Sequence, residues 1–215
     1  MPRIVCISDT HNCNERIEVP DGEILIHAGD ATTVGTKEQI GRFNDWFASL
    51  PHPHKVFVAG NHDWLFERDN GSARRLLDPG IVYLQDSSTE IDGLKIYGSP
   101  WQPRFFDWAF NLNRGQEMAE KWAMIPDDID ILITHGPPYG ILDLVPRSGW
   151  DENTGCEELR KRVEEITKVG SLKLHVFGHI HCGYGVHDEF GVKFVNASTC
   201  DEQYDPTQRP IVVDV

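Results

Sequence analysis

Five short apolar segments of the chain each end in residues that can bind a metal ion. The first, Ile4 to Ile7, leads directly to Asp9 and His11. An uninterrupted apolar run of this kind is typical of a strand buried on both faces of a parallel sheet. The carboxyl ends of such strands lie at one edge, where α/β proteins bind their ligands. The other four segments are followed by Gly29-Asp30, Gly60-Asn61-His62-Asp63, His135-Gly136 and Gly178-His179-Ile180-His181.

The recurrence of Asp, Asn and His at five strand ends predicts a metal site at this edge of the fold. Glycine beside these residues lets the backbone turn with positive φ and come close to a bound group. The donor set contains no thiolate and few carboxylates. It therefore suits Mn²⁺, Fe or Zn²⁺ better than Mg²⁺ or Ca²⁺.

Length and composition favour a single intracellular domain. We expect residues 1–215 to form one domain, because the chain has no break in composition and its 40% hydrophobic content can fill one large core. No apolar run approaches the ~20 residues of a membrane helix. Met1 to Arg3 lead directly into the first strand without the pattern of a signal peptide, so a cytoplasmic location is expected.

The charge and the cysteines exclude several classes of protein. A net charge of −14 opposes tight binding to a DNA or RNA backbone. A small anionic substrate is not excluded, since a local pair of divalent cations would dominate its surroundings. The five cysteines are odd in number and form no Cys-x-x-Cys pair, which indicates reduced thiols. Cys6 is expected in the core, and Cys182 is expected to be an inert thiol like it. The oligomeric state stays open.

The order of elements indicates two packed mixed sheets flanked by helices. Thr36 to Gln39 has the form of a capping box, and apolar spacing predicts a helix over residues 36–50. An aromatic loop over 98–110 and a Gly/Pro-rich loop over 136–155 lack regular patterning. Further helices are predicted around 73–77 and over 114–125 and 156–169. Strands are predicted over 4–7, 24–28, 55–59, 81–84, 90–97, 129–134, 172–177, 192–195 and 211–215.

The five strand-end blocks resemble, in order over residues 9–181, the pattern of calcineurin-like metallophosphoesterases. Other segments resemble the metallophosphoesterase-domain-containing branch of that family. The resemblance implies a four-layer α/β/β/α sandwich, and the branch is associated with cyclic nucleotide phosphodiesterase activity. The segments that carry the narrower resemblance are Gly98 to Pro103, Phe110 to Leu112, Arg114 to Gln116, Thr134 to Pro138 and Asn196 to Ser198.

The resemblance also implies a pair of divalent metal ions. Asp30 would bridge them, because two cations ~3.5–4 Å apart require a shared carboxylate. Such a pair lowers the pKa of a bridging water towards ~7, and that hydroxide is the expected nucleophile. The implied ligands are Asp9, His11, Asp30 and His181 for the first metal, and Asp30, Asn61, His135 and His179 for the second.

Other residues near these blocks receive alternative interpretations. His62 is the implied proton donor to the leaving oxygen, and otherwise a residue that positions the phosphate together with Asn61. Asp63 is expected to orient His62 or to cap the next helix. Asn12 would contact phosphate or turn the chain, and Tyr139 is a candidate substrate contact. For Trp101, Phe105 and Phe106, packing is favoured over a stacking wall for a nucleobase. Of the remaining histidines, His27 and His175 are predicted in the core, and His52, His54 and His187 on the surface.

The sequence therefore predicts a dinuclear metal-dependent phosphodiesterase that hydrolyses small phosphodiesters, with cyclic nucleotides as the expected substrates. A phosphomonoesterase or phosphoprotein phosphatase is the alternative. A catalytically weak nucleotide-binding scaffold is a third interpretation, since some members of this branch have glycine at the position of His179. Here both histidines of Gly-His-Ile-His are intact, which favours an enzyme.

Overall fold

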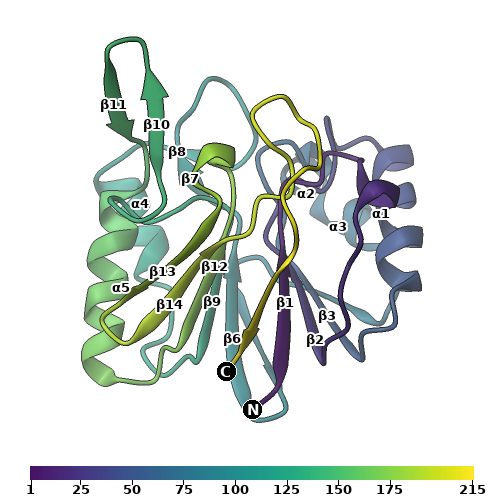
Figure 1. Cartoon of the computed structure of the whole chain (residues 1–215), viewed down its shortest axis with the longest axis horizontal. Helices are drawn as coiled ribbons and strands as arrows, with labels where there is room; N and C mark the ends of the chain where they lie inside the picture. Colours follow the sequence, from purple (N-terminus) through teal and green to yellow (C-terminus); the bar gives the residue numbers. More distant parts are fainter.

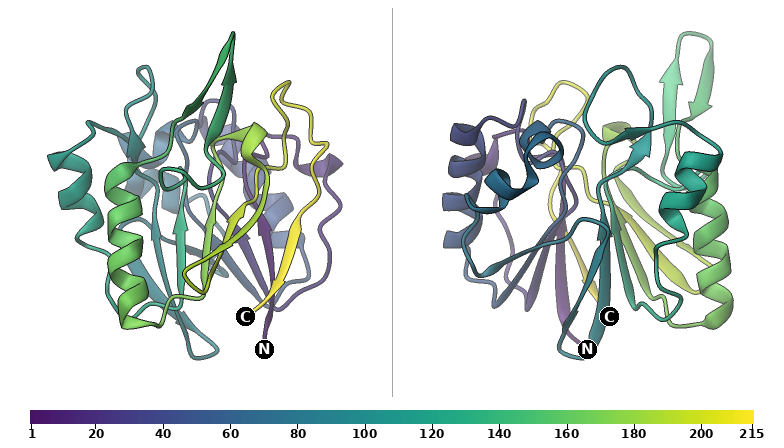
Figure 2. Two further views of the ribbon diagram at one scale, coloured as in Figure 1. Left: turned by 60° about the vertical axis from the view of Figure 1, so that its left-hand side comes forward. Right: turned by 180° about the vertical axis from the view of Figure 1, so that it is seen from behind.

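Two mixed β-sheets lie face to face at the centre of the molecule, and helices cover the outer face of each (Figure 1). The computed structural model describes residues 1–215. The two further views in Figure 2 show the same layers from the side and from behind. The predicted α/β/β/α order is confirmed.

The first sheet holds the strands that precede three of the predicted metal-binding blocks. Four of its strands run parallel, and the C-terminal strand adds antiparallel to the N-terminal one. This last pairing brings the two chain ends close together (Figure 1). In spatial order the strands are β15 (Ile211–Asp214), β1 (Arg3–Ile7), β2 (Ile24–His27), β3 (His54–Phe57) and β4 (Ile81–Tyr83).

The second sheet holds the strands that precede the other two blocks. Its four inner strands are parallel, and an antiparallel strand closes each edge. β9 leads to His135 and β12 to His179, at the same end of the molecule as the blocks of the first sheet. In spatial order the strands are β13 (Gly185–Glu189), β14 (Val192–Asn196), β12 (Leu174–Phe177), β9 (Ile131–Thr134), β6 (Leu94–Ser99) and β5 (Ser87–Ile91).

Alternation of side chains along each strand produces three apolar layers. Ile4 and Ile26 of the first sheet pack against Ile133 of the second in the layer between the sheets. Their neighbours Val5 and Leu25 point to the opposite face, into the layer beneath the first group of helices. A third layer lies beneath the helices of the second sheet. Both sheets are thus buried on two faces, which fixes the position of their strand ends.

The helices form two groups, and a side-chain cap begins three of them. Thr36 begins the first helix, since its Oγ1 accepts a hydrogen bond from the Gln39 N–H at 3.2 Å. The reciprocal half of the predicted capping box is wrong, because the Gln39 side chain accepts from the Val34 N–H instead. The helices are α1 (Lys37–Ser49), α2 (Trp64–Arg68) and α3 (Asn70–Arg74) on the first sheet, α4 (Gln116–Trp122) and α5 (Glu157–Val169) on the second, and the 3-10 turns η1 (Asn14–Arg16) and η2 (His181–Gly183).

Several predicted elements differ from the structure. The strand predicted over 90–97 is a hairpin of β5 and β6, because Asp92 and Gly93 both adopt positive φ and turn the chain between them. The helix predicted around 73–77 is replaced by α2 and α3, which meet at Asp69. Both irregular loops contain strands. In the first, β7 (Gln102–Pro103) pairs with β8 (Asn111–Leu112), which directly follows the loop. In the second, β10 (Leu144–Arg147) pairs with β11 (Trp150–Asn153).

The predictions for isolated residues had mixed outcomes. His27 and His175 are fully buried, as predicted. His52 is also buried, contrary to the surface prediction, because its ring bonds to the carbonyl oxygen of Pro20 at 2.9 Å. Cys6 is in the core, whereas Cys182 is exposed. None of the helices is both long and apolar enough to cross a membrane.

Candidate metal centre

The predicted ligand side chains converge where the carboxyl ends of both sheets meet. The Nε2 atoms of His11 and His181 lie 3.3 Å apart, although 170 residues separate them in sequence. On the other side of the site, His135 Nε2 lies 2.9 Å from Asn61 Oδ1. Three overlapping groups of side chains have donor atoms close enough to share a cation. They are Asp9, His11 and His181; His11, Asp30 and His62; and Asp30, His135 and His179.

Asp30 lies between the two halves of the cluster. Its Oδ2 is 3.4 Å from His135 Nε2 and 3.9 Å from His11 Nε2. Its Oδ1 accepts a hydrogen bond from the His62 N–H at 2.8 Å, which fixes the orientation of the carboxylate. Burial favours the neutral form of Asp30, but the nearby charges of His135 and His62 outweigh burial and hold its pKa well below the usual range. The side chain is therefore a charged oxygen ligand facing both sets of imidazoles.

Asp9 is held by the loop that carries the last ligand block. Its Oδ2 accepts from the His179 N–H at 3.0 Å and from Ser198 Oγ at 2.8 Å. A side chain at Gly178 would collide with this carboxylate. Glycine is thus required there, because the backbone of the second sheet approaches Asp9 closely.

Two of the imidazoles are oriented by hydrogen bonds from their far nitrogen. His135 Nδ1 donates to the carbonyl oxygen of Ala28 at 3.0 Å, and His181 Nδ1 donates to that of Asp201 at 2.8 Å. Each ring therefore turns its Nε2 towards the centre of the cluster. An imidazole that donates from one nitrogen to a carbonyl and offers the other to a cation is the usual arrangement at metal sites.

The ionisation of the four imidazole rings is also compatible with a bound cation. Burial lowers the pKa of His11 to about 4 and that of His179 to about 3, so both rings are neutral at pH 7. Burial acts in the same direction at His135 and His181, but Asp30 and Asp9 respectively outweigh it and raise both pKa values to about 9. A divalent cation would replace these protons while satisfying the same carboxylates.

Comparison with known proteins identifies the family. The model of the calcineurin-like phosphoesterases matches residues 2–183. The chain belongs to this family. Metallophosphoesterase domain-containing protein 1 of Homo sapiens is 43% identical over 235 residues, which cover 99% of this chain and 71% of that protein. UPF0046 protein K07C11.7 of Caenorhabditis elegans is 39% identical, with 98% and 74% covered.

A more distant relative has an activity in its name. The 3′,5′-cyclic-nucleotide phosphodiesterase alr5338 of Nostoc sp. is 23% identical over 171 residues, which cover 75% of this chain and 57% of that protein. The family and these relatives confirm the predicted resemblance, including its metallophosphoesterase-domain-containing branch. Membership implies a metal-dependent phosphoester hydrolase that uses divalent metal ions, and the oxygen and nitrogen donors of the cluster fit that requirement.

In this metallophosphoesterase, Asp63 links the ligand loops instead of orienting His62 or capping α2. Its carboxylate accepts hydrogen bonds from the backbone N–H groups of Gly60, Ala31 and Thr32 at 2.8–3.2 Å, and from the Thr32 hydroxyl. It makes no side-chain cap on α2. Burial, with the charge of Asp30, raises the pKa of Asp63 to about 6. Both predicted roles are wrong, because the carboxylate oxygens accept hydrogen bonds that join the loops after β2 and β3.

Asp63→Ala is expected to lower the free energy of unfolding by about 3–5 kcal/mol, since it leaves three buried N–H groups without an acceptor at roughly 1–3 kcal/mol each. Urea unfolding in the presence of a chelator measures this without a contribution from metal. Asp69→Ala is the matched control, because that exposed carboxylate only caps α3 and its loss should lower the free energy of unfolding far less. Equal effects of the two substitutions would contradict this role.

Asn12 and Tyr139 are predicted site residues that do not belong to the groups of candidate metal ligands. Asn12 has φ of 62° and its Oδ1 accepts from the Thr33 N–H at 3.1 Å, so it turns the chain and joins two loops. Its Nδ2 is buried without a partner, and contact of that atom with phosphate stays a prediction. Tyr139 is exposed and does not line the cavity beside the cluster, so its contact with substrate also stays a prediction.

Two aromatic residues of the site have no counterpart in the sequence prediction. Trp108 stacks on the His62 ring with centroids 4.1 Å apart. Tyr204 lies edge-on to His11 at 4.7 Å and to His181 at 5.2 Å. His62 Nδ1 donates to the carbonyl oxygen of Thr33 at 2.7 Å, and its Nε2 is 3.9 Å from Asp30 Oδ2. The ring of His62 is therefore held between a fixed hydrogen bond and an indole, with Nε2 towards the cluster.

Proposed function

We propose that the chain is a dinuclear metal-dependent phosphodiesterase for small phosphodiesters, with cyclic nucleotides as the first substrates to test. One observation carries this proposal: Asp30 Oδ2 faces His11 on one side and His135 on the other, at 3.9 and 3.4 Å. A carboxylate in that position suits a bridge between two cations. In the proposal, Asp9, His11, Asp30 and His181 hold one ion, and Asp30, Asn61, His135 and His179 hold the other.

Two bound divalent ions supply an activated water for in-line attack on phosphorus and offset the negative charge that develops on the phosphoryl oxygens. The chain itself positions the other participants. Asn61 and His62 follow β3 beside the other cluster side chains, and in the proposal they contact a phosphoryl oxygen. His62 presents Nε2 towards the cluster, because its Nδ1–H is committed to Thr33. From there it can give a proton to the leaving oxygen.

The size of the site and one relative support a small substrate. The cavity beside His179 and His181 has a volume of about 460 Å³, which is within the range of sites for small molecules. The Nostoc relative is named as a cyclic-nucleotide phosphodiesterase, although it is only 23% identical to this chain. The chain's net charge of −14 disfavours a nucleic-acid polymer as substrate.

Purified protein loaded with Mn²⁺, Fe²⁺ or Zn²⁺ is expected to hydrolyse bis(p-nitrophenyl) phosphate at least about tenfold faster than p-nitrophenyl phosphate, in terms of kcat/KM. Comparison of 3′,5′- and 2′,3′-cyclic nucleotides then defines the natural class of diester. Elemental analysis should find two metal ions per chain. A preference for the monoester would favour the phosphatase alternative, and less than one metal per chain without turnover would favour the scaffold.

A further inference from the structure

The cavity beside the metal centre has a cationic side. The residues that line this cavity include His179 and His181, but none of the residues of the loop that follows β3. Three arginines, from three separate segments, belong to its lining, although the chain holds only 20 basic residues against 34 acidic ones. They are Arg104 after β7, Arg114 before α4 and Arg147 at the end of β10.

Arg147 is the arginine most available to a ligand. It lies on the β10–β11 hairpin, which projects beyond the sheets on the side of the cluster (Figure 1). Its Nε donates to Glu152 across the hairpin at 3.1 Å, and its two terminal amino groups have no partner in the protein. Glu152 thus occupies one edge of the guanidinium and leaves the other edge free. That free edge matches the paired oxygens of a phosphate or carboxylate.

The other two arginines differ in how many of their guanidinium donors already bind protein groups. Arg114 donates to the carbonyl oxygens of Gly155 and Thr154 and pairs with Glu157, so it anchors the base of the hairpin. Arg104 donates through Nε to Asn113 at 3.3 Å and lies 3.7 Å from the fully exposed Asp107. Such an exposed pair is weak, and Arg104 therefore keeps donors for a ligand.

The acidic residues around the cavity leave two of the arginines with unused donors. Glu152 and Glu202 line it together with the three arginines, and Glu157 and Asp107 pair with Arg114 and Arg104 from outside the lining. Glu152 is engaged with the Nε edge of Arg147. Phe105 and Tyr204 also line the cavity, where Phe105 lies edge-on to His179 and Tyr204 edge-on to His11, and they offer apolar surface. The combination suits a ligand with an aromatic or sugar body and an anionic end.

We propose that this cavity binds the ester group that stays on phosphorus, and that this group carries a second anionic substituent, which Arg147 and Arg104 bind. The assignment of the retained group rests on the proposed function. In an in-line displacement the leaving oxygen departs opposite the attacking water, towards His62, which does not line the cavity. The retained ester group then lies to the side of the line that joins the attacking water, phosphorus and the leaving oxygen. The substrate class is thus a phosphodiester of a nucleotide that bears its own phosphate.

Equilibrium binding to the Mn²⁺-loaded protein tests the subsite without turnover. Thymidine 3′,5′-bisphosphate is expected to bind about tenfold more tightly than thymidine 5′-monophosphate, as one charge-assisted contact allows. Arg147→Gln should remove most of that preference and leave the monophosphate affinity within about twofold. Glu152→Gln should change the bisphosphate affinity in the opposite direction, because it frees a further edge of the guanidinium.

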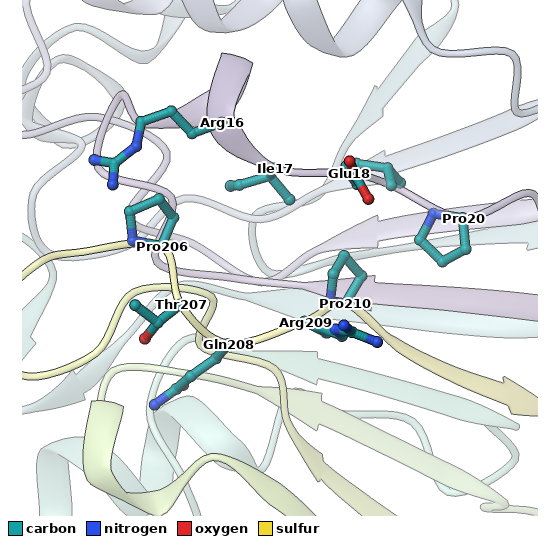
Figure 3. Close-up of a pocket in the computed structure, with 10 residues that line it drawn as sticks. Arg16, Ile17, Glu18, Pro20, Pro206, Thr207, Gln208, Arg209 and Pro210 are labelled. Atoms are coloured by element: carbon teal, nitrogen blue, oxygen red, sulfur yellow. The ribbon is translucent and has the colours of Figure 1, made fainter.

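Arg209→Gln is the matched control, since it removes the same charge from a different groove. Figure 3 shows Arg209 in that groove, which is formed by residues 16–20 and 206–210 and contains none of the cluster side chains. Equal affinity of the wild type for both nucleotides, or equal effects of R147Q and R209Q, would overturn the proposal.

Kinetics with a common leaving group separate this inference from the proposed function. The p-nitrophenyl 5′-esters of thymidine 5′-phosphate and of thymidine 3′,5′-bisphosphate should differ about tenfold in kcat/KM, and R147Q should abolish the difference. Turnover of both esters without a preference would overturn the subsite alone. No turnover, with the bisphosphate preference intact in binding, would overturn the phosphodiesterase and leave only the binding of the second anionic group by Arg147 established.

Discussion

Asp30→Asn is expected to lower kcat for bis(p-nitrophenyl) phosphate by about 10⁴-fold and to leave the chain folded. The amide retains an oxygen that can accept from the His62 N–H, so the loop after β2 keeps its anchor. The other position changes from a charged oxygen to an NH₂ group that faces the Nε2 atoms of His11 and His135. A donor in that place cannot bridge two cations and repels them. The site should lose metal as well as activity.

The matched control is Asp130→Asn. Asp130 directly precedes β9, the strand that delivers His135 at its other end, and its carboxylate bonds to Lys95 and Lys173 far from the cluster. Circular dichroism should show both variants folded, while elemental analysis should find metal depleted only in D30N. Near-normal turnover of D30N at saturating metal would contradict the bridging role.

The positions of the candidate metal-ligand side chains could be predicted because each depends on local sequence. A buried parallel strand places the next residues at the sheet edge, and five such strands in two packed sheets necessarily bring their ends together. Asp9 and His179 follow this rule, though they belong to different sheets. The two-sheet architecture was likewise predictable, since the apolar runs leave no face of these strands for water.

The residues that hold the site in place could not be predicted in the same way. Trp108 reaches His62 only because the 98–110 segment folds over the end of β3, where the Ala109 N–H donates to the carbonyl oxygen of Asn61. Tyr204 packs against His11, which lies at the other end of the sequence, and against His181. Neither position has a periodic signal, and only tertiary packing decides where such a loop lies. The sequence predicts the wrong hydrogen-bond partners for Asp63, because an Asp before a short helix is also a typical helix cap.

The strand before the Asp92-Gly93 turn could not be predicted for a different reason. The two turn residues signal a tight hairpin turn, but the strand before it, β5, reads Ser87-Ser88-Thr89-Glu90-Ile91 and has only one apolar residue. Pairing with β6 makes it a strand, because an edge strand needs little apolar surface of its own. Partner strands, and not local preference, determine such elements.

His62→Ala is expected to slow the hydrolysis of esters with poor leaving groups by about 10²–10³-fold, and that of p-nitrophenyl esters by less than about threefold. An alkoxide or ribose oxygen needs a proton as it departs, whereas p-nitrophenolate does not. A series of aryl and alkyl methyl phosphates should therefore show a steeper dependence of log kcat on leaving-group pKa in H62A than in the wild type.

The geometry around the ring provides two further variants. His54→Ala is the matched control, because His54 begins β3 at the end away from the cluster and is only partly buried. Trp108→Leu removes the indole that stacks on His62 and should give the same leaving-group pattern at a smaller amplitude, since the Thr33 hydrogen bond still holds Nδ1. A uniform loss across the whole series in H62A would instead mean that the imidazole positions the phosphate. The slope of the series, more than the size of the loss, therefore decides whether His62 donates the proton.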